Sequence, residues 1–425
     1  MSRPRVVIRD GAAADLASWC GEAGYGRLLI IADSRTRAAL GAAVEEALRA
    51  AGLAARSVVL DFPEVQADAH AILEVILSLD AADQALVAVG SGTITDITRF
   101  VSHRAGLPFV SVPTAPSVDG FPSPGSPLIV RGIKMTAAAH PPVAIFADLA
   151  VLCSAPRAML AAGFGDMLGK ITSVADWKLA SLLWDLPFDG KIAGRCMDAA
   201  HGCMDAADEI ASAGPRGVQK LLEALLESGF CMLDFGSSLP ASGAEHHLSH
   251  FWEMKLLSEG RPAILHGSKV GAATVLVAGL YQRLRQVSRA DAAAMLRAVR
   301  RPSADDEMRL IRQAYGPAAD QVARTQASFL EMTDPGWERL ARKIEGCWES
   351  ILEIAREVPD PQEIARLLKR VGGPSTVEEL GLPDSWGRQA ISAAHYLRNH
   401  FTVVKLLRML GGGESGIIGR EEARK

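Results

Sequence analysis

The sequence has little excess charge of either sign, few cysteines for its length and no long apolar run. Its 45 Lys and Arg against 49 Asp and Glu residues give a net charge of −4 without a basic stripe, which argues against a nucleic-acid partner. The six cysteines form no Cys-x-x-Cys pair, so we expect reduced, mostly buried thiols in a cytoplasmic protein. The longest apolar stretch, 272–280, falls short of the ~20 residues that span a membrane. The charged N-terminus does not resemble a signal peptide, so we expect no membrane association.

A chain of 425 residues with 49% apolar residues and a mean hydropathy of +0.14 is large enough for two domains. The first third alternates short, almost continuously apolar runs with amphipathic stretches, a pattern typical of a parallel sheet covered on both faces. The expected strands are Arg5–Ile8, Arg27–Ala32, Ser57–Leu60, Ala85–Val89, Phe109–Val112 and Val143–Phe146. The expected helices between them are Thr36–Ala51, Asp68–Leu79 and Thr93–His103.

After about residue 150 the strand pattern stops, and helical stretches are separated by proline and glycine. The fold class predicted is therefore an α/β, doubly wound, parallel-sheet nucleotide-binding domain over residues 1–152, followed by an all-α domain over residues 153–425. The tryptophans of the second part are expected to fill its core.

A glycine turn follows the fourth expected strand, at Gly90, Ser91 and Gly92. Small residues there let backbone N–H groups approach a diphosphate, and the helix that follows turns its positive end toward the anion. The alternative is a plain β-α turn, because the sequence matches neither the GxGxxG fingerprint nor the Walker loop.

Asp33 ends the second expected strand and has two interpretations. Its carboxylate can bind an adenosine ribose and repel a 2′-phosphate, which favours NAD over NADP. It can equally act as the N-cap of the helix that follows.

Four of the ten histidines lie within residues 234–267. His246 and His250 are four residues apart and so share one helical face, while His247 points about 100° away. His266 follows twenty residues after His246 and is expected to open another helix. Asp166, in a glycine-rich stretch, is either a further ligand or the N-cap of a helix. Two imidazoles and one carboxylate suffice for a divalent metal, whereas isolated histidines often serve only as core or surface residues.

Five segments in this order resemble the sn-glycerol-1-phosphate dehydrogenase family, within the superfamily of iron-type alcohol dehydrogenases, glycerol dehydrogenases and dehydroquinate synthases. They are Gly90-Ser-Gly-Thr-Ile-Thr-Asp96, Pro113-Thr-Ala-Pro-Ser-Val-Asp119-Gly-Phe, Gly163-Phe-Gly-Asp166-Met-Leu-Gly-Lys170, Ser242-Gly-Ala-Glu-His246-x-x-x-His250 and His266-Gly267. The segment Tyr396-Leu-Arg-Asn-His-Phe-Thr also resembles the bacterial branch.

The resemblance implies an active site between an NAD-binding domain and a helical metal domain, commonly in a homodimer or higher homo-oligomer. The residues implied for the cofactor are Gly90, Ser91, Gly92, Thr93 and Ile94 at the pyrophosphate, with Thr114, Ser117 and Ser123 on the nicotinamide side. Asp166, His246 and His266 would hold Zn²⁺ or Ni²⁺. Asp119, Asp166 and His250 would face the substrate, with Asp119 and His250 taking part in catalysis.

The expected reaction is reduction of dihydroxyacetone phosphate to sn-glycerol 1-phosphate by NADH or NADPH, with the metal as Lewis acid. Lys134 and Lys170 are candidate donors to the substrate phosphate, although lysines at such positions are more often solvated charges or partners of a nearby aspartate. Two further functions stay open: a metal-dependent dehydrogenase for glycerol or another phosphorylated or phosphonate alcohol, and a dehydroquinate-synthase-like cyclase. A catalytically inactive nucleotide-binding protein is a third possibility.

Overall fold

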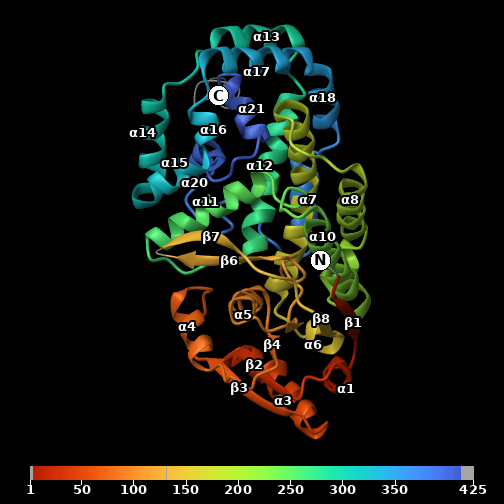
Figure 1. Cartoon of the computed structure of the whole chain (residues 1–425). Coiled ribbons are helices and arrows are strands. Elements are labelled where there is room, and N and C mark those ends of the chain that lie inside the picture. The colour runs from red at the N-terminus through yellow and green to blue at the C-terminus, as the bar shows by residue number, and fades with distance from the viewer. Residues whose placement is uncertain (1–2, 131, 413–425) are drawn as a thin grey trace. The chain divides into compact units, whose positions relative to one another are not determined.

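The computed structural model describes residues 3–130 and 132–412, and its N-terminal part contains a six-stranded parallel sheet (Figure 1). The strand order is β1-β8-β5-β4-β2-β3. The strands are β1 (Arg5–Arg9), β2 (Arg27–Asp33), β3 (Ala54–Leu60), β4 (Ala85–Val89), β5 (Phe109–Val112) and β8 (Ala144–Asp148). All six predicted strands are confirmed, with ends that differ by up to three residues.

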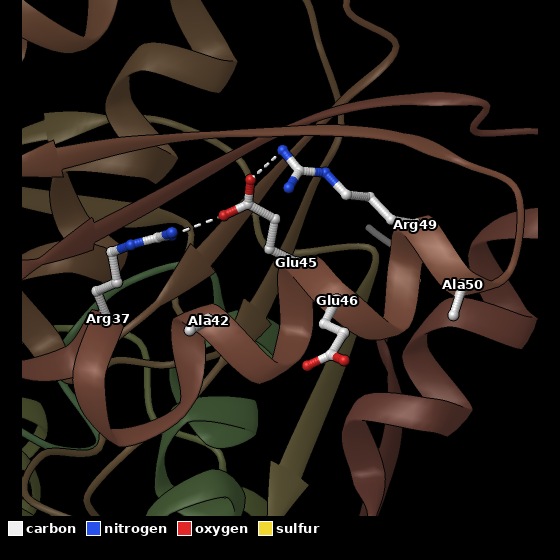
Figure 2. A pocket seen from close by; sticks show the side chains of 6 residues that line it. All are labelled: Arg37, Ala42, Glu45, Glu46, Arg49 and Ala50. Carbon is white, nitrogen blue, oxygen red and sulfur yellow. Dashed lines mark hydrogen bonds and ion pairs between the residues drawn. The ribbon is translucent and has the colours of Figure 1, made fainter.

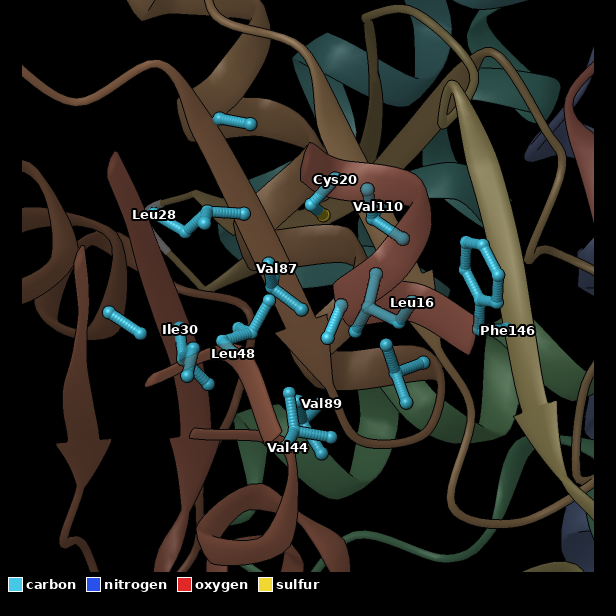
Figure 3. Packing of buried hydrophobic residues seen from close by; sticks show 14 of the residues in the cluster. Leu16, Cys20, Leu28, Ile30, Val44, Leu48, Val87, Val89, Val110 and Phe146 are labelled. Atoms are coloured by element: carbon cyan, nitrogen blue, oxygen red, sulfur yellow. The ribbon is translucent and has the colours of Figure 1, made fainter. Parts of the chain in front are cut away.

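The helices that cover this sheet bury alternate residues of its strands. Leu28 and Ile30 of β2 pack with α1 and α3 on one face, as Figure 3 shows, whereas Leu29 and Ile31 pack with α4 and α5 on the other. This burial on both faces explains why the strands are almost continuously apolar. The helices of this region are α1 (Ala12–Glu22), α2 (Ser34–Thr36), the π-helical turn η1 (Arg37–Gly41), α3 (Ala42–Ala50), α4 (Ala69–Leu77), α5 (Gly92–Ala105) and α6 (Leu149–Cys153).

Three features of this region were not predicted. They are the helices α1 and α6, and an antiparallel hairpin of β6 (Gly125–Val130) and β7 (Ile133–Ala138). The hairpin forms its own two-stranded sheet, and its strands are half-buried or exposed at most positions. Its sequence therefore carries no continuous apolar run of the kind that marks the central strands.

Beyond β8, the described residues form helices only, as predicted for the second part of the chain. These are α7 (Arg157–Trp184), α8 (Gly190–Asp205), α9 (Ala207–Ser212), α10 (Pro215–Phe235), α11 (Ala244–Ser258), α12 (His266–Leu284), α13 (Arg289–Ala298), α14 (Ala304–Tyr315), the 3₁₀ turn η2 (Gly316–Ala318), α15 (Ala319–Thr325), α16 (Ala327–Leu330), α17 (Asp334–Gly346), α18 (Trp348–Arg356), α19 (Pro361–Arg370), α20 (Ser385–Ala393), the 3₁₀ turn η3 (Ala394–Tyr396) and α21 (Val403–Met409). No described helix has the length and apolar character needed to cross a membrane.

By packing, the chain divides into two compact units. The first comprises Met1–Met167, Asp198–Ser237 and Arg370–Gly372, and the second comprises Leu168–Met197, Ser238–Lys369 and Gly373–Lys425. Because α7 and α8 each contribute residues to both units, this division differs from a single cut after residue 152. The predicted boundary between a nucleotide-binding domain over residues 1–152 and an all-α domain over residues 153–425 stays a prediction. The expectation of mostly buried cysteines is confirmed, since Cys20, Cys196, Cys203 and Cys231 are buried.

Candidate active site

The glycine turn lies where the winding of the sheet changes direction. The chain runs outward from β2 to β3, returns to place β4 beside β2, and then continues through β5 to β8. In open α/β sheets, ligands bind at the carboxyl ends of strands that flank such a reversal. Here those ends are Asp33 on β2 and Gly90 after β4, so two predicted cofactor-binding positions lie on neighbouring strands.

The turn leaves the start of α5 suited to an anion. The Gly90 N–H donates to Val112 at 3.1 Å, and the Gly90 carbonyl accepts from the Thr114 N–H at 3.3 Å. Ser91 is the N-cap residue of α5, but its side chain makes no capping hydrogen bond. Its hydroxyl instead contacts that of Ser117 at 2.5 Å. The first N–H groups of α5 therefore depend on another acceptor, as the diphosphate of a nucleotide would provide.

Asp33 acts as a helix cap, which confirms the second of its two interpretations. Its Oδ1 accepts from the Thr36 N–H at 2.7 Å, and its own N–H donates to the Thr36 hydroxyl at 3.0 Å. This reciprocal capping box starts α2 and fixes the carboxyl group at the end of β2. Ribose binding by Asp33 stays a prediction that its position allows.

The loop after β5 carries Thr114, Ser117 and Asp119, all of which are buried. The Ser228 hydroxyl donates to Asp119 Oδ2 at 2.8 Å, so that the carboxylate has a fixed orientation. The buried guanidinium of Arg99 donates to the carbonyls of Gly120 and Phe121 at 2.6 and 2.9 Å.

Ser123 lies just beyond this loop and is half-buried. Its hydroxyl accepts from the Gly125 N–H at 3.0 Å, so it has a local role in the turn that starts β6. Its predicted contact with the nicotinamide side is not tested by this bond and stays a prediction.

Asp166 lies in the middle of α7, not at a helix start, so the interpretation of Asp166 as an N-cap is wrong. The helix begins at Arg157, directly after Pro156, and passes through the glycine-rich stretch without a break. The stretch is rich in glycine for a different reason, because a Cβ on Gly163 would lie 1.9 Å from the Pro116 carbonyl oxygen. Asp166 is fully buried, and its Oδ2 accepts the Asp119 N–H at 3.0 Å.

The two candidate phosphate-binding lysines have different surroundings. Lys134 lies half-buried on β7. Lys170 is fully buried on α7, and its Nζ donates to the Ala241 carbonyl at 3.0 Å. Lys170 is therefore not a solvated charge, although its role toward a substrate stays a prediction.

Three histidines converge on two neighbouring helices of the second unit, α11 and α12 (Figure 1). His246 and His250 share one face of α11, as predicted, with ring centroids 6.3 Å apart. His266 is the first residue of α12, also as predicted, and its ring centroid lies 5.3 Å from that of His246 and 5.6 Å from that of His250.

A buried carboxylate orients His246. Glu245 Oε1 lies 2.8 Å from His246 Nδ1 and accepts the Gly243 N–H at 2.7 Å, while Oε2 accepts the Thr172 hydroxyl at 2.6 Å. Burial favours the neutral acid, but these hydrogen bonds and the charge of His246 outweigh it and hold the pKa of Glu245 below its usual value. With Nδ1 bound to a carboxylate, Nε2 is the nitrogen left to a metal, an arrangement common around metal-ligating histidines.

The donor set of this region fits a divalent metal. The predicted ligand His266 also forms a group with His250 and Glu253, in which each residue offers a ligand atom within 4.8 Å of the others. Imidazole and carboxylate ligands suit Zn²⁺ and Ni²⁺ alike, so the chemistry of the donors does not choose between the two metals.

Sequence reasoning missed Asp176, whose carboxylate binds the helices that surround the three histidines. Its Oδ2 accepts from the Ala244 N–H at the start of α11, and its Oδ1 accepts from the Tyr281 hydroxyl and the Val403 N–H, all at 2.7 Å. One carboxylate on α7 thereby joins α11, α12 and α21. Nothing in the local sequence distinguishes Asp176 or Glu245 from the acidic residues of a solvated helix face, so only the assembled fold identifies them.

A cavity of about 410 Å³ lies against α3, away from these residues (Figure 2). Glu45 in its wall binds Arg37 and Ser57 at 2.7 Å each and also contacts Arg49. Although burial opposes it, these contacts hold the pKa of Glu45 below its usual value. Arg37 and Arg49 in the lining are thus paired with Glu45, and none of the predicted site residues lines this cavity.

Comparison with known sequences gives relatives over nearly the whole chain. A glycerol-1-phosphate dehydrogenase [NAD(P)+] of Geobacillus stearothermophilus is 38% identical over 411 residues, covering 96% of this chain and 92% of the relative. The protein of the same name from Geobacillus thermodenitrificans is 36% identical over 411 residues, covering 96% and 93%. Residues 7–156 also match the family model of iron-containing alcohol dehydrogenases.

Solved structures of low sequence identity share the fold. Glycerol dehydrogenase from Schizosaccharomyces pombe matches with a TM-score of 0.59 at 16% identity, covering 100% of this chain and 92% of the other. An iron-containing alcohol dehydrogenase from Corynebacterium glutamicum matches with a TM-score of 0.60 at 15% identity, covering 97% and 95%. The predicted architecture is therefore confirmed.

Proposed function

The chain belongs to the glycerol-1-phosphate dehydrogenase family, and from this premise we propose that it interconverts dihydroxyacetone phosphate and sn-glycerol 1-phosphate with NAD(H) or NADP(H). The observation that carries the proposal is the pairing of His246 and His266, whose ring centroids lie 5.3 Å apart with Glu245 behind His246. Such a pair supplies two of the imidazole ligands that a metal site needs, and the glycine turn after β4 is suited to a nucleotide diphosphate.

In this proposal the nucleotide lies over the carboxyl ends of β2 and β4. The N–H groups at the start of α5, from Gly90 to Ile94, hold its pyrophosphate. Thr114, Ser117 and Ser123 face the nicotinamide. The carboxylate of Asp33 favours NAD(H), because it would repel the 2′-phosphate of NADP(H). When bound, the nicotinamide supplies or accepts the hydride.

Asp166, His246 and His266 hold one divalent metal, Zn²⁺ or Ni²⁺. When bound, this ion acts as a Lewis acid on the substrate oxygen. Glu245 keeps His246 in the tautomer whose Nε2 can bind it. Buried and already bonded to the Asp119 N–H, Asp166 is a ligand that changes little in position when the ion enters.

Asp119 and His250 act on the substrate itself. Ser228 and the hydrogen bond to Asp166 fix Asp119, which accepts a substrate hydroxyl and so orients the carbon that exchanges hydride. His250 takes the hydroxyl proton during oxidation and returns it during reduction. We expect the enzyme to work as a homo-oligomer in the cytoplasm, where thiols stay reduced.

A substrate panel tests the function. Metal-stripped enzyme, and enzyme restored with Zn²⁺ or Ni²⁺, are mixed with NADH and with dihydroxyacetone phosphate, dihydroxyacetone or a phosphonate analogue, and the loss of NADH absorbance is followed. We expect metal-dependent turnover with dihydroxyacetone phosphate well above that with dihydroxyacetone. No net NADH oxidation with any of them would favour a cyclase, and equal rates would favour an enzyme for unphosphorylated alcohols.

His266→Ala separates the two binding functions. We expect it to abolish turnover while NADH affinity, measured by fluorescence titration, stays within about twofold, because its imidazole lies with the metal ligands and not at the glycine turn. Loss of NADH binding together with turnover would show that the roles assigned here are wrong.

A further inference from the structure

A second group of basic side chains surrounds His247, on the flank of α11 next to the three histidines described above. Its members are His247, Arg398, His400 and Lys405, here called the basic cluster. Arg398 and His400 come from the segment that leads into α21, and Lys405 lies in α21 itself. All four belong to the second unit.

Lys405 fixes the shape of this segment. It is fully buried, and its Nζ donates to the carbonyls of Arg398 and His400 at 3.2 and 2.9 Å. The ammonium also lies 5.2 Å from the ring centroid of Trp184 and 5.6 Å from that of Phe329. Because Lys405 bonds both carbonyls, the backbone that carries the side chains of Arg398 and His400 has little freedom to move.

Several buried polar atoms in and beside the cluster have no hydrogen-bond partner within the described residues. His247 is 1% exposed, and within the described residues neither of its ring nitrogens has a hydrogen-bond partner. The same holds for Nδ1 of His400, whose ring centroid lies 5.9 Å from that of His247, and for the hydroxyl of Thr402. Unsatisfied buried polar atoms are costly and rare in folded proteins, and here several gather at one place.

The electrostatics of the cluster favour an anion. Burial with the charges of Arg398 and Lys405 lowers the pKa of His400 to about 4, and burial lowers the pKa of Lys405 to about 7. The charges of Arg398 and Lys405 thus disfavour the protonated form of His400, and a bound anion would offset that effect.

We propose that His247, Arg398 and His400, on a backbone held by Lys405, bind the phosphate group of the substrate. This assignment rests on the proposed function. His250 is three residues from His247 and four from His246, so it borders both the basic cluster and the metal-ligating histidines. A three-carbon substrate then places its reacting oxygen toward His246 and His266 and its phosphate toward Arg398. Half-buried Arg398 and His400 leave the phosphate a route from solvent.

Selective loss of phosphate recognition tests this site. The variants are Arg398→Gln, which removes the charge, and Arg398→Lys, which keeps the charge but not the planar fork. Arg366→Gln is the matched control, because Arg366 is an exposed arginine of α19 in the same unit. We expect Arg398→Gln to raise KM for dihydroxyacetone phosphate on the order of 10- to 100-fold, Arg398→Lys to raise it less, and Arg366→Gln to leave it unchanged. The kcat/KM for dihydroxyacetone, which has no phosphate, should change less than about twofold in all three.

Inorganic phosphate serves as a probe that is independent of turnover. In the full-length protein with NADH, phosphate binding measured by calorimetry should weaken in Arg398→Gln and in a second variant, His400→Gln, but not in Arg366→Gln. Circular dichroism and NADH affinity establish that the variants fold. If Arg398→Gln does not fold, His400→Gln decides whether the cluster binds phosphate.

The outcomes distinguish the two proposals. If the wild type turns over dihydroxyacetone phosphate but both cluster variants keep its KM and their phosphate affinity, the phosphate assignment is wrong and the function stands. An equal loss of kcat/KM with dihydroxyacetone would also overturn it, because it would reveal a merely structural role. If the wild type does not turn over dihydroxyacetone phosphate, the function is wrong, and the phosphate titration still decides whether the cluster binds phosphate.

Discussion

Gly163→Ala adds a single methyl group and should thereby weaken NADH binding and lower the activity of the enzyme. Gly163 lies inside α7, where the added Cβ would lie 1.9 Å from the Pro116 carbonyl oxygen and 3.0 Å from its carbon. Ordinary contact starts at 3.4 Å, so the backbone of the 113–119 loop or of α7 has to move by roughly 1.5 Å. Neither partner is the end of a flexible side chain.

The expected cost is near the upper end of the overpacking range, about 3 kcal/mol of unfolding free energy. The same movement displaces Ser117 and Asp119, which are fixed by Ser91, Ser228 and Asp166. A misplacement of about 1 Å can reduce turnover about 100-fold. We therefore expect Gly163→Ala to lower kcat/KM for dihydroxyacetone phosphate by about that factor and to weaken NADH binding.

Gly202→Ala is the matched control. Gly202 lies in helix α8 of the same unit, and a Cβ there meets nothing within 4 Å. Alanine is a better helix former than glycine by about 1 kcal/mol, so this variant should be stabilised slightly and keep full activity. Urea unfolding, fluorescence titration with NADH and initial rates measure these effects. If Gly163→Ala matches Gly202→Ala in stability and NADH affinity, the close approach of α7 to Pro116 is not a constraint on the site.

Three further predictions concern buried ionisable groups. Glu245→Gln should weaken metal affinity about 10- to 100-fold in a chelator competition, because His246 loses its orienting carboxylate; unchanged affinity would argue against that role. Burial and the charge of Glu245 raise the pKa of Asp176 to about 7, above its value in the unfolded chain, so the stability that its protonation contributes is lost as pH rises toward 7. Asp176→Asn should thus show a weaker loss of urea stability between pH 5 and about 8 than the wild type, and equal slopes would refute this assignment. Burial raises the pKa of the Cys203 thiol to about 12, so mass spectrometry after brief iodoacetamide treatment should find Cys153, which is partly exposed, labelled before Cys203.

The sheet was predictable from sequence because its strands are buried on both faces, and continuous apolar runs such as Ala85–Val89 record that burial directly. The hairpin was not predictable in this way, since its exposed positions include Val130 and Met135 and no apolar run results. Glycines are ambiguous for a related reason. Gly163 is needed because the carbonyl of Pro116, which is far away in the sequence, lies against it in the fold. The local sequence pattern alone resembles a helix start.

The residues of the site likewise fall into those that could be predicted from the sequence and those that could not. His246, His250 and His266 could be grouped from sequence, because helical spacing and a nearby helix start bring them together without knowledge of the fold. Glu245 and Asp176 could not, because their roles come from partners such as Thr172 and Val403 that the assembled fold supplies. The resemblance to a family supplied roles for individual residues that periodicity alone does not give.

The hydrogen bond from Val403 to Asp176 has a consequence for how the protein matures in the cell. The two residues are 227 positions apart, so Asp176 leaves the ribosome long before Val403 does. Until then, the carboxylate that holds the start of α11 lacks one of its donors. The histidines on α11 should therefore reach their final arrangement only after residue 403 has been synthesised, so metal uptake should follow that point. A nascent chain that stalls before residue 403 should already bind nucleotide but capture metal poorly.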